Sequence, residues 1–124
     1  MNSAASPSSG VLVACLCADW CYICKDYKAV FESLRGDFGA QAAFVWVDIE
    51  DNEDALGNVD VDDFPTFLVA RGDAVVHFGP VMPRREAAVR AVQRALRGES
   101  SVVADTRLEQ LAQRIRALAD ARAG

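Results

Sequence analysis

Two cysteines separated by two residues, Cys21 and Cys24, stand where an apolar segment gives way to a helical pattern. At the start of a helix, unpaired backbone N–H groups and the helix dipole stabilise a negatively charged sulfur, which makes a nucleophilic thiolate. A second thiol one turn further along is close enough to attack a mixed disulfide formed by the first. The spacing therefore indicates dithiol–disulfide chemistry.

The other two cysteines, Cys15 and Cys17, lie in the apolar segment just before this pair. Such clustering favours redox or metal chemistry over a secreted disulfide framework, which would spread its cysteines along the chain. A period of two places Cys15 and Cys17 on one face of a strand, and packing as small hydrophobes is the leading interpretation. A four-sulfur zinc or iron–sulfur site and a regulatory thiol that oxidises with a partner are the alternatives. We expect no metal and no cofactor, because two sulfurs held in a buried strand converge poorly with the helical pair.

Length and composition point to one globular domain. The chain has 124 residues, of which 52% are hydrophobic and 25% are charged, with a net charge of −5. An acidic chain is a poor partner for nucleic acid or an anionic membrane. No apolar run approaches the roughly 20 residues of a membrane span, and no basic segment precedes the first apolar run as in a signal peptide. A cytoplasmic location is therefore expected.

Hydrophobic periodicity and turn residues predict a mixed α/β domain with a central sheet. Strands are expected over 11–18 and 42–49, with a hairpin of 66–70 and 74–78. Helices are expected over 21–35, capped by Asp19 and closed by Gly36, and from Pro83 to Gly98. Residues 51–57 suit a short helix or a loop.

A final helix is expected over 105–122, where Thr106 and Glu109 have the spacing of a capping box. The leading interpretation of its apolar stripe is that the stripe packs on the domain's own sheet, and a dimer or partner surface is the alternative. The stripe consists of Leu108, Leu111, Ile115 and Leu118.

Three segments, taken in order, resemble the thioredoxin superfamily. Residues 18–25 (Ala-Asp-Trp-Cys-Tyr-Ile-Cys-Lys) resemble its active-site segment, Phe64-Pro65-Thr66 its cis-proline loop, and Gly79 a glycine that lines its substrate groove. The resemblance covers 11–98 and implies a three-layer thioredoxin-like fold. It leaves residues 1–10 as a flexible lead-in and 99–124 as a C-terminal helical extension. Because the family's opening strand and helix have almost no room in 1–10, we expect the final helix to cover the surface left bare.

The resemblance also implies a role for each site residue. Cys21 would attack a substrate disulfide and Cys24 would resolve the intermediate, leaving a redox-active Cys21–Cys24 disulfide. Pro65 would be cis. The residues implied in substrate binding are Trp20, Tyr22, Ile23, Phe64, Pro65 and Gly79.

The chain departs from the family's pattern behind the dithiol. Cys15 and Trp46 occupy the positions of a buried Asp and its Lys partner. Deprotonation of Cys24 is therefore expected to rely on water, or on Asp19 or Asp26. The family's Gly-Pro between the cysteines is replaced by Tyr22-Ile23, so the family's reduction potential does not carry over.

Two further features lie outside the motif. His77, the only histidine, is interpreted as a surface or core residue on a hairpin strand. The acidic run over 48–63 is interpreted as a solvated face, with steering of basic substrates as the alternative.

These observations predict a thiol–disulfide oxidoreductase that reduces protein disulfides and is itself reduced by an unidentified thiol reductase. A monomer is expected, with a dimer through the final helix as the alternative. The rival function is a non-catalytic thioredoxin-fold binding or redox-sensing module.

Overall fold

A single four-stranded sheet forms the centre of the molecule. The computed structural model describes residues 10–123, so the lead-in expected over 1–10 lies outside the described residues except for Gly10. The strand order is β2-β1-β3-β4; β1 and β2 are parallel, and β3 is antiparallel to both β1 and β4. The strands are β1 (Val11–Cys17), β2 (Ala42–Asp48), β3 (Thr66–Arg71) and β4 (Ala74–Pro80).

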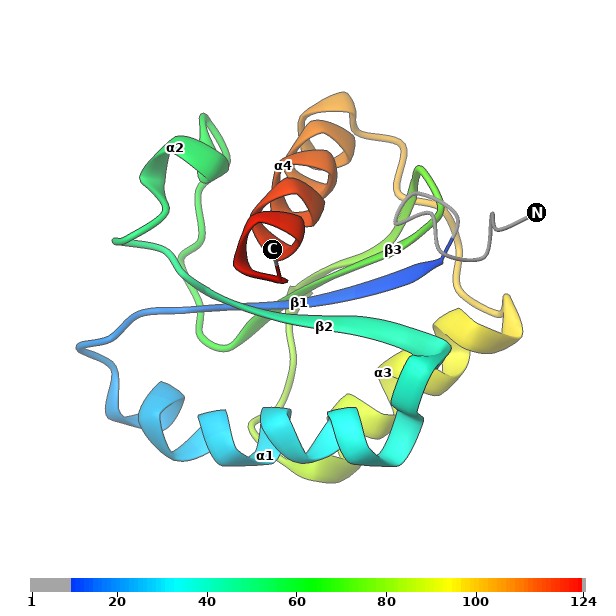
Figure 1. The fold of residues 1–124 in the computed structure, drawn as a ribbon, viewed down its shortest axis with the longest axis horizontal. Helices are drawn as coiled ribbons and strands as arrows, with labels where there is room; N and C mark the ends of the chain where they lie inside the picture. The colour runs from blue at the N-terminus through cyan, green and yellow to red at the C-terminus, as the bar shows by residue number, and fades with distance from the viewer. Residues whose placement is uncertain (1–9, 124) are drawn as a thin grey trace.

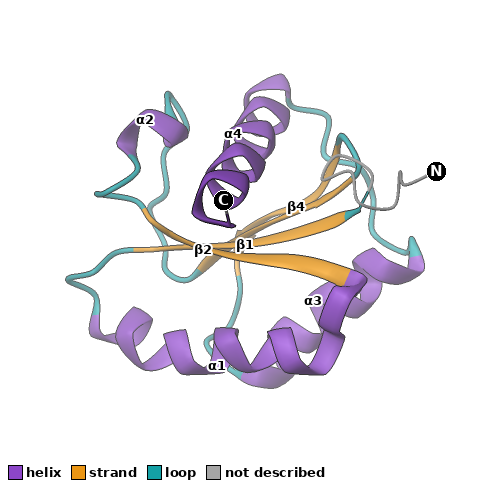
Figure 2. Ribbon diagram, viewed as in Figure 1, coloured by secondary structure: helices purple, strands orange, loops and turns teal. Residues whose placement is uncertain are grey.

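Helices cover both faces of this sheet (Figure 1). The helices are α1 (Tyr22–Phe38), α2 (Glu53–Leu56), α3 (Arg85–Arg97) and α4 (Thr106–Ala123), with a 3-10 turn over Gly39–Gln41. Figure 2 shows α1 and α3 on one side of the strands and α4, with the short α2, on the other. The expected mixed α/β architecture with three layers is confirmed.

The alternation of side chains along β1 divides the core into two halves. Val13, Cys15 and Cys17 belong to the half beneath α1 and α3. Leu12 and Leu16 belong to the half beneath α4. The expectation that Cys15 and Cys17 share one face of the strand is therefore confirmed, and that face is the one covered by α1.

Helix α4 covers the second face of the sheet through the predicted apolar stripe. Leu108, Leu111 and Ile115 are buried against residues of all four strands. The Arg116 guanidinium also donates hydrogen bonds to the carbonyl oxygens of Gly10 and Gly72, at 3.0 and 3.1 Å. Packing of the final helix on the domain's own sheet is confirmed.

Helix α1 differs from its predicted limits at both ends. Cys21 occupies the N-cap position without a side-chain hydrogen bond, and Asp19 is exposed, so the prediction that Asp19 caps this helix is wrong. Gly36 lies inside the helix, which continues to Phe38 and ends at Gly39, where φ is 57°. A positive φ is accessible to glycine at low cost, so Gly39 can take the conformation that ends the helix.

The other two long helices also begin differently from the prediction. Helix α3 begins at Arg85, two residues after Pro83. At α4, the Asp105 carboxylate accepts a hydrogen bond from the Arg107 N–H at 2.9 Å, and Thr106 is already helical. The predicted Thr106–Glu109 capping box is therefore replaced by an aspartate cap one residue earlier.

Candidate functional site

The candidate site lies at the turn that leads from β1 into α1, at the left edge of the view in Figure 1. The Cys21 N–H donates to the Ala18 carbonyl at 3.1 Å, and the Cys21 carbonyl accepts from the Lys25 N–H at 3.2 Å. These two bonds close the turn and begin the helix. They leave Cys21 partly exposed at the helix N-terminus, with Cys24 buried one turn further along.

The disulfide in this structure joins Cys17 to Cys24 and leaves Cys21 as a free thiol. The Cα atoms of Cys17 and Cys24 are 5.8 Å apart, and each residue is 1% exposed. The expected Cys21–Cys24 bond is therefore not the one present, and Cys17 is not merely a packed thiol. Cys17 ends β1 on the face that α1 covers, and Cys24 points from α1 into the same half of the core. The inference that strand sulfurs converge poorly with the helical pair is wrong for Cys17.

Cys15 is a free, fully buried thiol, as its predicted packing role requires. Burial raises the pKa of Cys15, so this group stays protonated at neutral pH. Its Sγ donates a weak hydrogen bond to Cys17 Sγ at 4.0 Å. Among residues 10–123, no group of three or more His, Cys, Asp or Glu side chains is arranged to hold a metal ion.

The Phe64–Pro65 peptide bond is cis, as the resemblance implied. The Pro65 carbonyl accepts a hydrogen bond from the Val81 N–H at 3.0 Å, which ties the loop to the end of β4. The Phe64 ring lies against Trp20, with 5.5 Å between ring centroids and an interplanar angle of 87°. The structure thus brings the loop from 64–66 against the residue that precedes Cys21.

Four side chains form an apolar rim at this end of the molecule: Trp20, Tyr22, Ile23 and Phe64. Trp20 is 64% exposed, Tyr22 74% and Ile23 39%. Large exposed apolar side chains gathered at one place are typical of an interaction site. Trp20 Nε1 donates a hydrogen bond to the Glu50 carboxylate at 2.8 Å, a contact between loops that the sequence analysis missed.

A small cavity of about 50 Å³ lies beside Cys24 and is lined in part by Asp19, Trp46 and Asp48. This volume is enough for one water molecule, and the lining supplies polar partners for it. Asp26 does not line the cavity and is exposed. Of the two aspartates considered from the sequence, Asp19 is therefore the one near Cys24.

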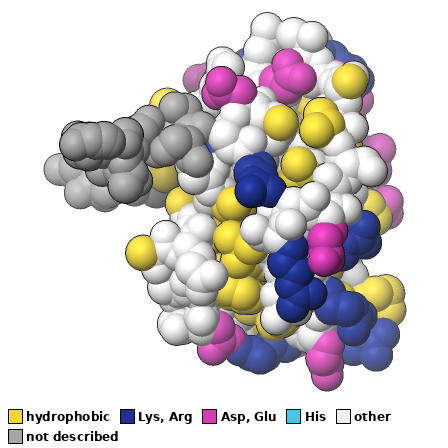
Figure 3. All heavy atoms as spheres, turned by 90° about the vertical axis from the view of Figure 1, so that its right-hand side faces the viewer, with side chains coloured by type: hydrophobic (Ala, Val, Ile, Leu, Met, Phe, Trp, Pro, Cys, Tyr) yellow, Lys and Arg dark blue, Asp and Glu magenta, His cyan; other side chains and the backbone are white. Residues whose placement is uncertain are grey.

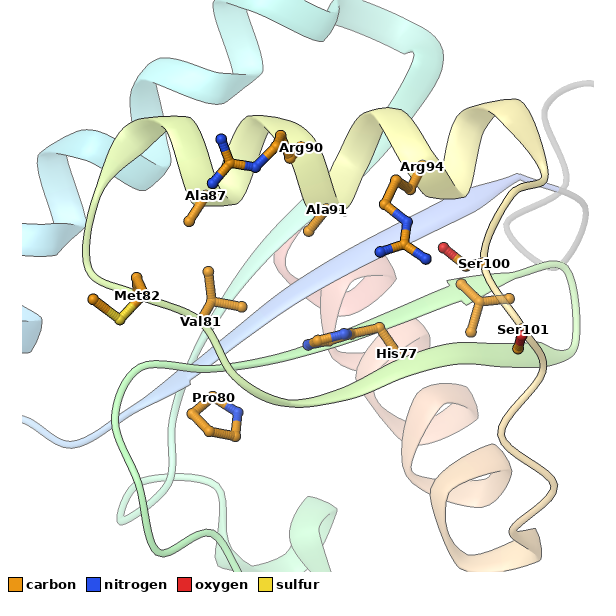
Figure 4. A pocket seen from close by; sticks show the side chains of 11 residues that line it. His77, Pro80, Val81, Met82, Ala87, Arg90, Ala91, Arg94, Ser100 and Ser101 are labelled. Carbon is orange, nitrogen blue, oxygen red and sulfur yellow. The ribbon is translucent and has the colours of Figure 1, made fainter.

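His77 lies in a different hollow, between β4 and α3 (Figure 4). This groove of about 420 Å³ is also lined by Arg90 and Arg94, and no cysteine lines it. Burial lowers the pKa of His77, whose Nε2 lies 3.2 Å from the Gly79 carbonyl oxygen. His77 is interpreted from the sequence as a surface or core residue, and the structure places it half-buried on β4, away from the cysteines.

Gly79 lies near the end of β4, where it pairs with Phe67 of β3. The next residue, Pro80, pairs with Thr66. A Cβ atom placed on Gly79 would meet nothing within 4 Å among the described residues. The strand therefore has open space at the position that the resemblance assigns to the substrate groove.

The charged side chains are unevenly distributed. On the face seen in Figure 3, Lys and Arg side chains lie mainly along one side of a strip of hydrophobic side chains. In the acidic run, Asp48 accepts hydrogen bonds from the backbone N–H groups of Glu50 and Asp51 at 2.9 and 3.2 Å. This one acid therefore has a structural role in the turn that positions Glu50 beside Trp20.

A dithiol at a helix start, a cis-proline loop against it and a central sheet covered on both faces are features of thioredoxin-fold proteins. The family model for thioredoxin matches residues 2–90. Thioredoxin from Bacillus subtilis is 32% identical over 92 residues, which is 74% of this chain and 88% of that protein. Thioredoxin from Staphylococcus haemolyticus is 33% identical over 76 residues, covering 58% of this chain and 73% of the relative. The chain belongs to the thioredoxin family.

Solved structures agree on the fold. The germline-specific thioredoxin Deadhead of Drosophila melanogaster superposes with a TM-score of 0.62 at 19% identity, covering 69% of this chain and 81% of that one. Fasciola hepatica thioredoxin gives a TM-score of 0.62 at 22% identity, with the same coverage. Family membership and the cysteine disulfide together indicate thiol–disulfide oxidoreductase activity in general terms.

Within the described part of the chain, no helix is both long and apolar enough to cross a bilayer.

Proposed function

We propose that this protein reduces protein disulfides through a dithiol cycle of Cys21 and Cys24. The observation that carries the proposal is the free, partly exposed Cys21 thiol at the N-cap of α1, between the exposed rim residues Trp20 and Tyr22 in the sequence. Cys24 lies three residues further along the same helix and is shielded from solvent. One thiol is accessible to a substrate and the other only to cysteines of the same chain, as attacker and resolver require.

The proposed cycle has two exchange steps. The Cys21 thiolate attacks one sulfur of the substrate disulfide, which forms a mixed disulfide and releases the other substrate sulfur as a thiolate. The Cys24 thiolate then attacks Cys21 Sγ, which forms the Cys21–Cys24 bond and releases the second substrate thiolate. Two electrons pass from the dithiol to the substrate.

Substrate docking is assigned to the apolar rim and to the loop before Pro65. An extended substrate segment could pair with the Phe64 backbone, while its apolar side chains pack on Trp20, Tyr22 and Ile23. The space beside Gly79 would admit the same segment. The neighbouring acidic run would favour substrates with basic residues close to their disulfide.

The proton that Cys24 loses in the second step needs an acceptor. In this chain, Cys15 occupies the position of the buried aspartate that the family usually has there. Burial raises the pKa of Cys15, so it cannot serve as a base near neutral pH. The cavity beside Cys24 has room for a water molecule next to Asp19. We assign the proton transfer to that water, with Asp19 as the carboxylate that orients it.

The proposed electron donor is a thiol reductase that acts on the Cys21–Cys24 disulfide from the same rim. The proposed location is the cytoplasm, because the four cysteines lie close together in the sequence and do not staple distant loops. The proposed oligomeric state is a monomer, since Leu108, Leu111 and Ile115 of the α4 stripe are already buried against the sheet.

A second candidate function is a redox-sensing or binding module without turnover. The Cys17–Cys24 disulfide favours it, since Cys24 cannot resolve a mixed disulfide while it is bonded to Cys17.

Insulin reduction with dithiothreitol as electron source separates the two functions. Catalysis by the wild type, lost in Cys21→Ser and retained in Cys15→Ala, is expected for the enzyme. Cys15→Ala is the matched control because Cys15 is a cysteine of the same cluster that takes no part in the cycle. A wild type no faster than dithiothreitol alone would leave only the sensing or binding module.

A further inference from the structure

The proposed cycle uses Cys21 and Cys24 and gives no role to Cys17, yet Cys17 is the residue bonded to Cys24. We propose that Cys17 is a third redox-active cysteine, which takes the disulfide from Cys21–Cys24 into the core as Cys17–Cys24 and restores Cys21 as a free thiol. This inference rests on the proposed function for the formation of the Cys21–Cys24 bond.

The geometry gives Cys24 two alternative partners. Cys21 lies three residues before it at the helix start, a separation at which side chains on a helix are neighbours. Cys17 ends the strand beneath it, with the Cα atoms 5.8 Å apart, which is within the range that a disulfide spans. One partner is partly exposed and the other is 1% exposed. Moving the bond from Cys21 to Cys17 therefore moves it from the surface to the interior.

The transfer is an intramolecular thiol–disulfide exchange. The Cys17 thiolate attacks Cys24 Sγ, the Cys17–Cys24 bond forms, the Cys21–Cys24 bond breaks, and Cys21 leaves as a thiolate. One disulfide is present before and after the step, so no external oxidant or reductant is needed. The proton lost by Cys17 is balanced by the one that Cys21 can take up from solvent.

The surroundings of the three sulfurs favour this direction. A thiolate is better solvated at the helix N-terminus, where Cys21 lies, than in the core beside Cys17. A disulfide is uncharged, so its burial avoids the cost of burying a thiolate. The Cys15 thiol lies 4.0 Å from Cys17 Sγ, but its burial keeps it protonated, so it takes no part in the exchange.

The buried Cys17–Cys24 disulfide should be reduced slowly by external reductants. Because Cys17 and Cys24 are each 1% exposed, an external reductant reaches the bond between them poorly. The reverse exchange, in which the Cys21 thiolate attacks Cys24 Sγ, returns the bond to the accessible position. Cys21 is then the entry point for electrons as well as for substrate.

Peptide mapping can identify which cysteines are bonded. Cleavage before Asp19 and after Lys25 places Cys15 and Cys17 in one peptide and Cys21 with Cys24 in the peptide 19–25. The reduced full-length chain is oxidised with one equivalent of diamide, quenched in acid, alkylated with N-ethylmaleimide under denaturing conditions and digested. A Cys17–Cys24 bond links the two peptides, whereas a Cys21–Cys24 bond stays within one.

We expect the linked pair as the main product in the wild type, with the label on Cys15 and Cys21. Cys15→Ala, the matched control two residues away on the same face, should give the same linked pair. Cys17→Ala should give the bond within 19–25, and circular dichroism should show the same fold. A wild type whose main disulfide lies within 19–25 would overturn the proposal without any use of a variant.

A second measurement tests Cys21 as the entry point. Oxidised Cys21→Ser, which carries the Cys17–Cys24 bond, should be reduced by dithiothreitol at least about ten-fold more slowly than the oxidised wild type. In denaturant the two rates should converge. Equal rates in the native proteins would contradict the reverse exchange.

The two proposals fail separately. Insulin reduction with a disulfide confined to 19–25 would remove the role of Cys17 and leave the enzyme. A linked pair in a wild type that does not reduce insulin would remove the proposed function and leave Cys17 as the partner of Cys24.

Discussion

Cys15 on β1 and Trp46 on β2 are register partners across the parallel pair of strands, in the half of the core beneath the dithiol. An indole cannot exchange a proton near neutral pH, and burial raises the pKa of the Cys15 thiol. The pair therefore fills the space behind Cys24 without supplying a base. A cavity lined in part by Asp19, Trp46 and Asp48 provides polar space beside Cys24.

Asp19→Asn should slow the resolution of the mixed disulfide, because it removes the carboxylate that orients water beside Cys24. We expect insulin reduction to slow by about ten-fold, the lower part of the range for general base catalysis. The mixed disulfide should accumulate in a single-turnover experiment quenched in acid. Asp26→Asn is the matched control, since Asp26 is exposed and does not line the cavity. Equal slowing in both variants would point to a general charge effect in place of a role for Asp19.

Glu50→Ala should weaken the binding of protein substrates, because the Glu50 carboxylate holds Trp20 through its indole N–H at 2.8 Å. A hydrogen bond to a charged group contributes about 1.5–3 kcal/mol in a shielded site and less at an exposed one such as this. We therefore expect KM for insulin to rise a few-fold, with little change in the rate with a small aromatic disulfide. Glu53→Ala removes an exposed acid from the same segment as a control. A change in the small-disulfide rate as large as the change in KM would contradict a role confined to docking.

Leu111→Asp and Ile115→Asp should each strongly destabilise the fold, because both side chains are fully buried between α4 and the sheet. Loss of the apolar contacts and burial of a carboxylate should together lower the free energy of unfolding by at least about 3 kcal/mol. Urea titration followed by circular dichroism measures this change. Gln113→Asp places the same carboxylate at an exposed position of the same helix. Retention of wild-type stability by the two core variants would show that α4 is not part of the folded unit.

The free energy of unfolding should decrease as the pH is lowered, because His77 becomes protonated more readily in the unfolded chain. Burial lowers the pKa of His77 in the folded state, so the unfolded chain, with an ordinary histidine pKa near 6.5, binds this proton more readily. The contribution of the neutral imidazole is complete above that value and is lost as the pH falls toward the folded pKa. The free energy of unfolding of the wild type should thus decrease between pH 7.5 and 5.5 more steeply than that of His77→Gln. Parallel profiles would assign the pH dependence to carboxylates alone.

Local sequence pattern was enough to predict the strands, the hairpin, the shared face of Cys15 and Cys17, and the thiol at the start of a helix. Each of these depends on a period of two or on helical spacing within a few residues. The limits of α1 depended on more than the local pattern. Gly36 and Gly39 are equally suited to end a helix by type, and the turn into β2 decided between them.

Only the tertiary structure decided which sulfur bonds to Cys24. Cys17 and Cys21 are seven and three residues away from it, and both are near enough in sequence. The choice depends on how the turn from Ala18 to Trp20 folds α1 back over β1, which places the last strand side chain beneath the first turn of the helix. The contacts of Trp20 with Phe64 and Glu50 join separate loops in the same way. Sequence spacing sets which groups exist and how far the chain can reach, whereas the packing of helix on sheet sets which of them meet.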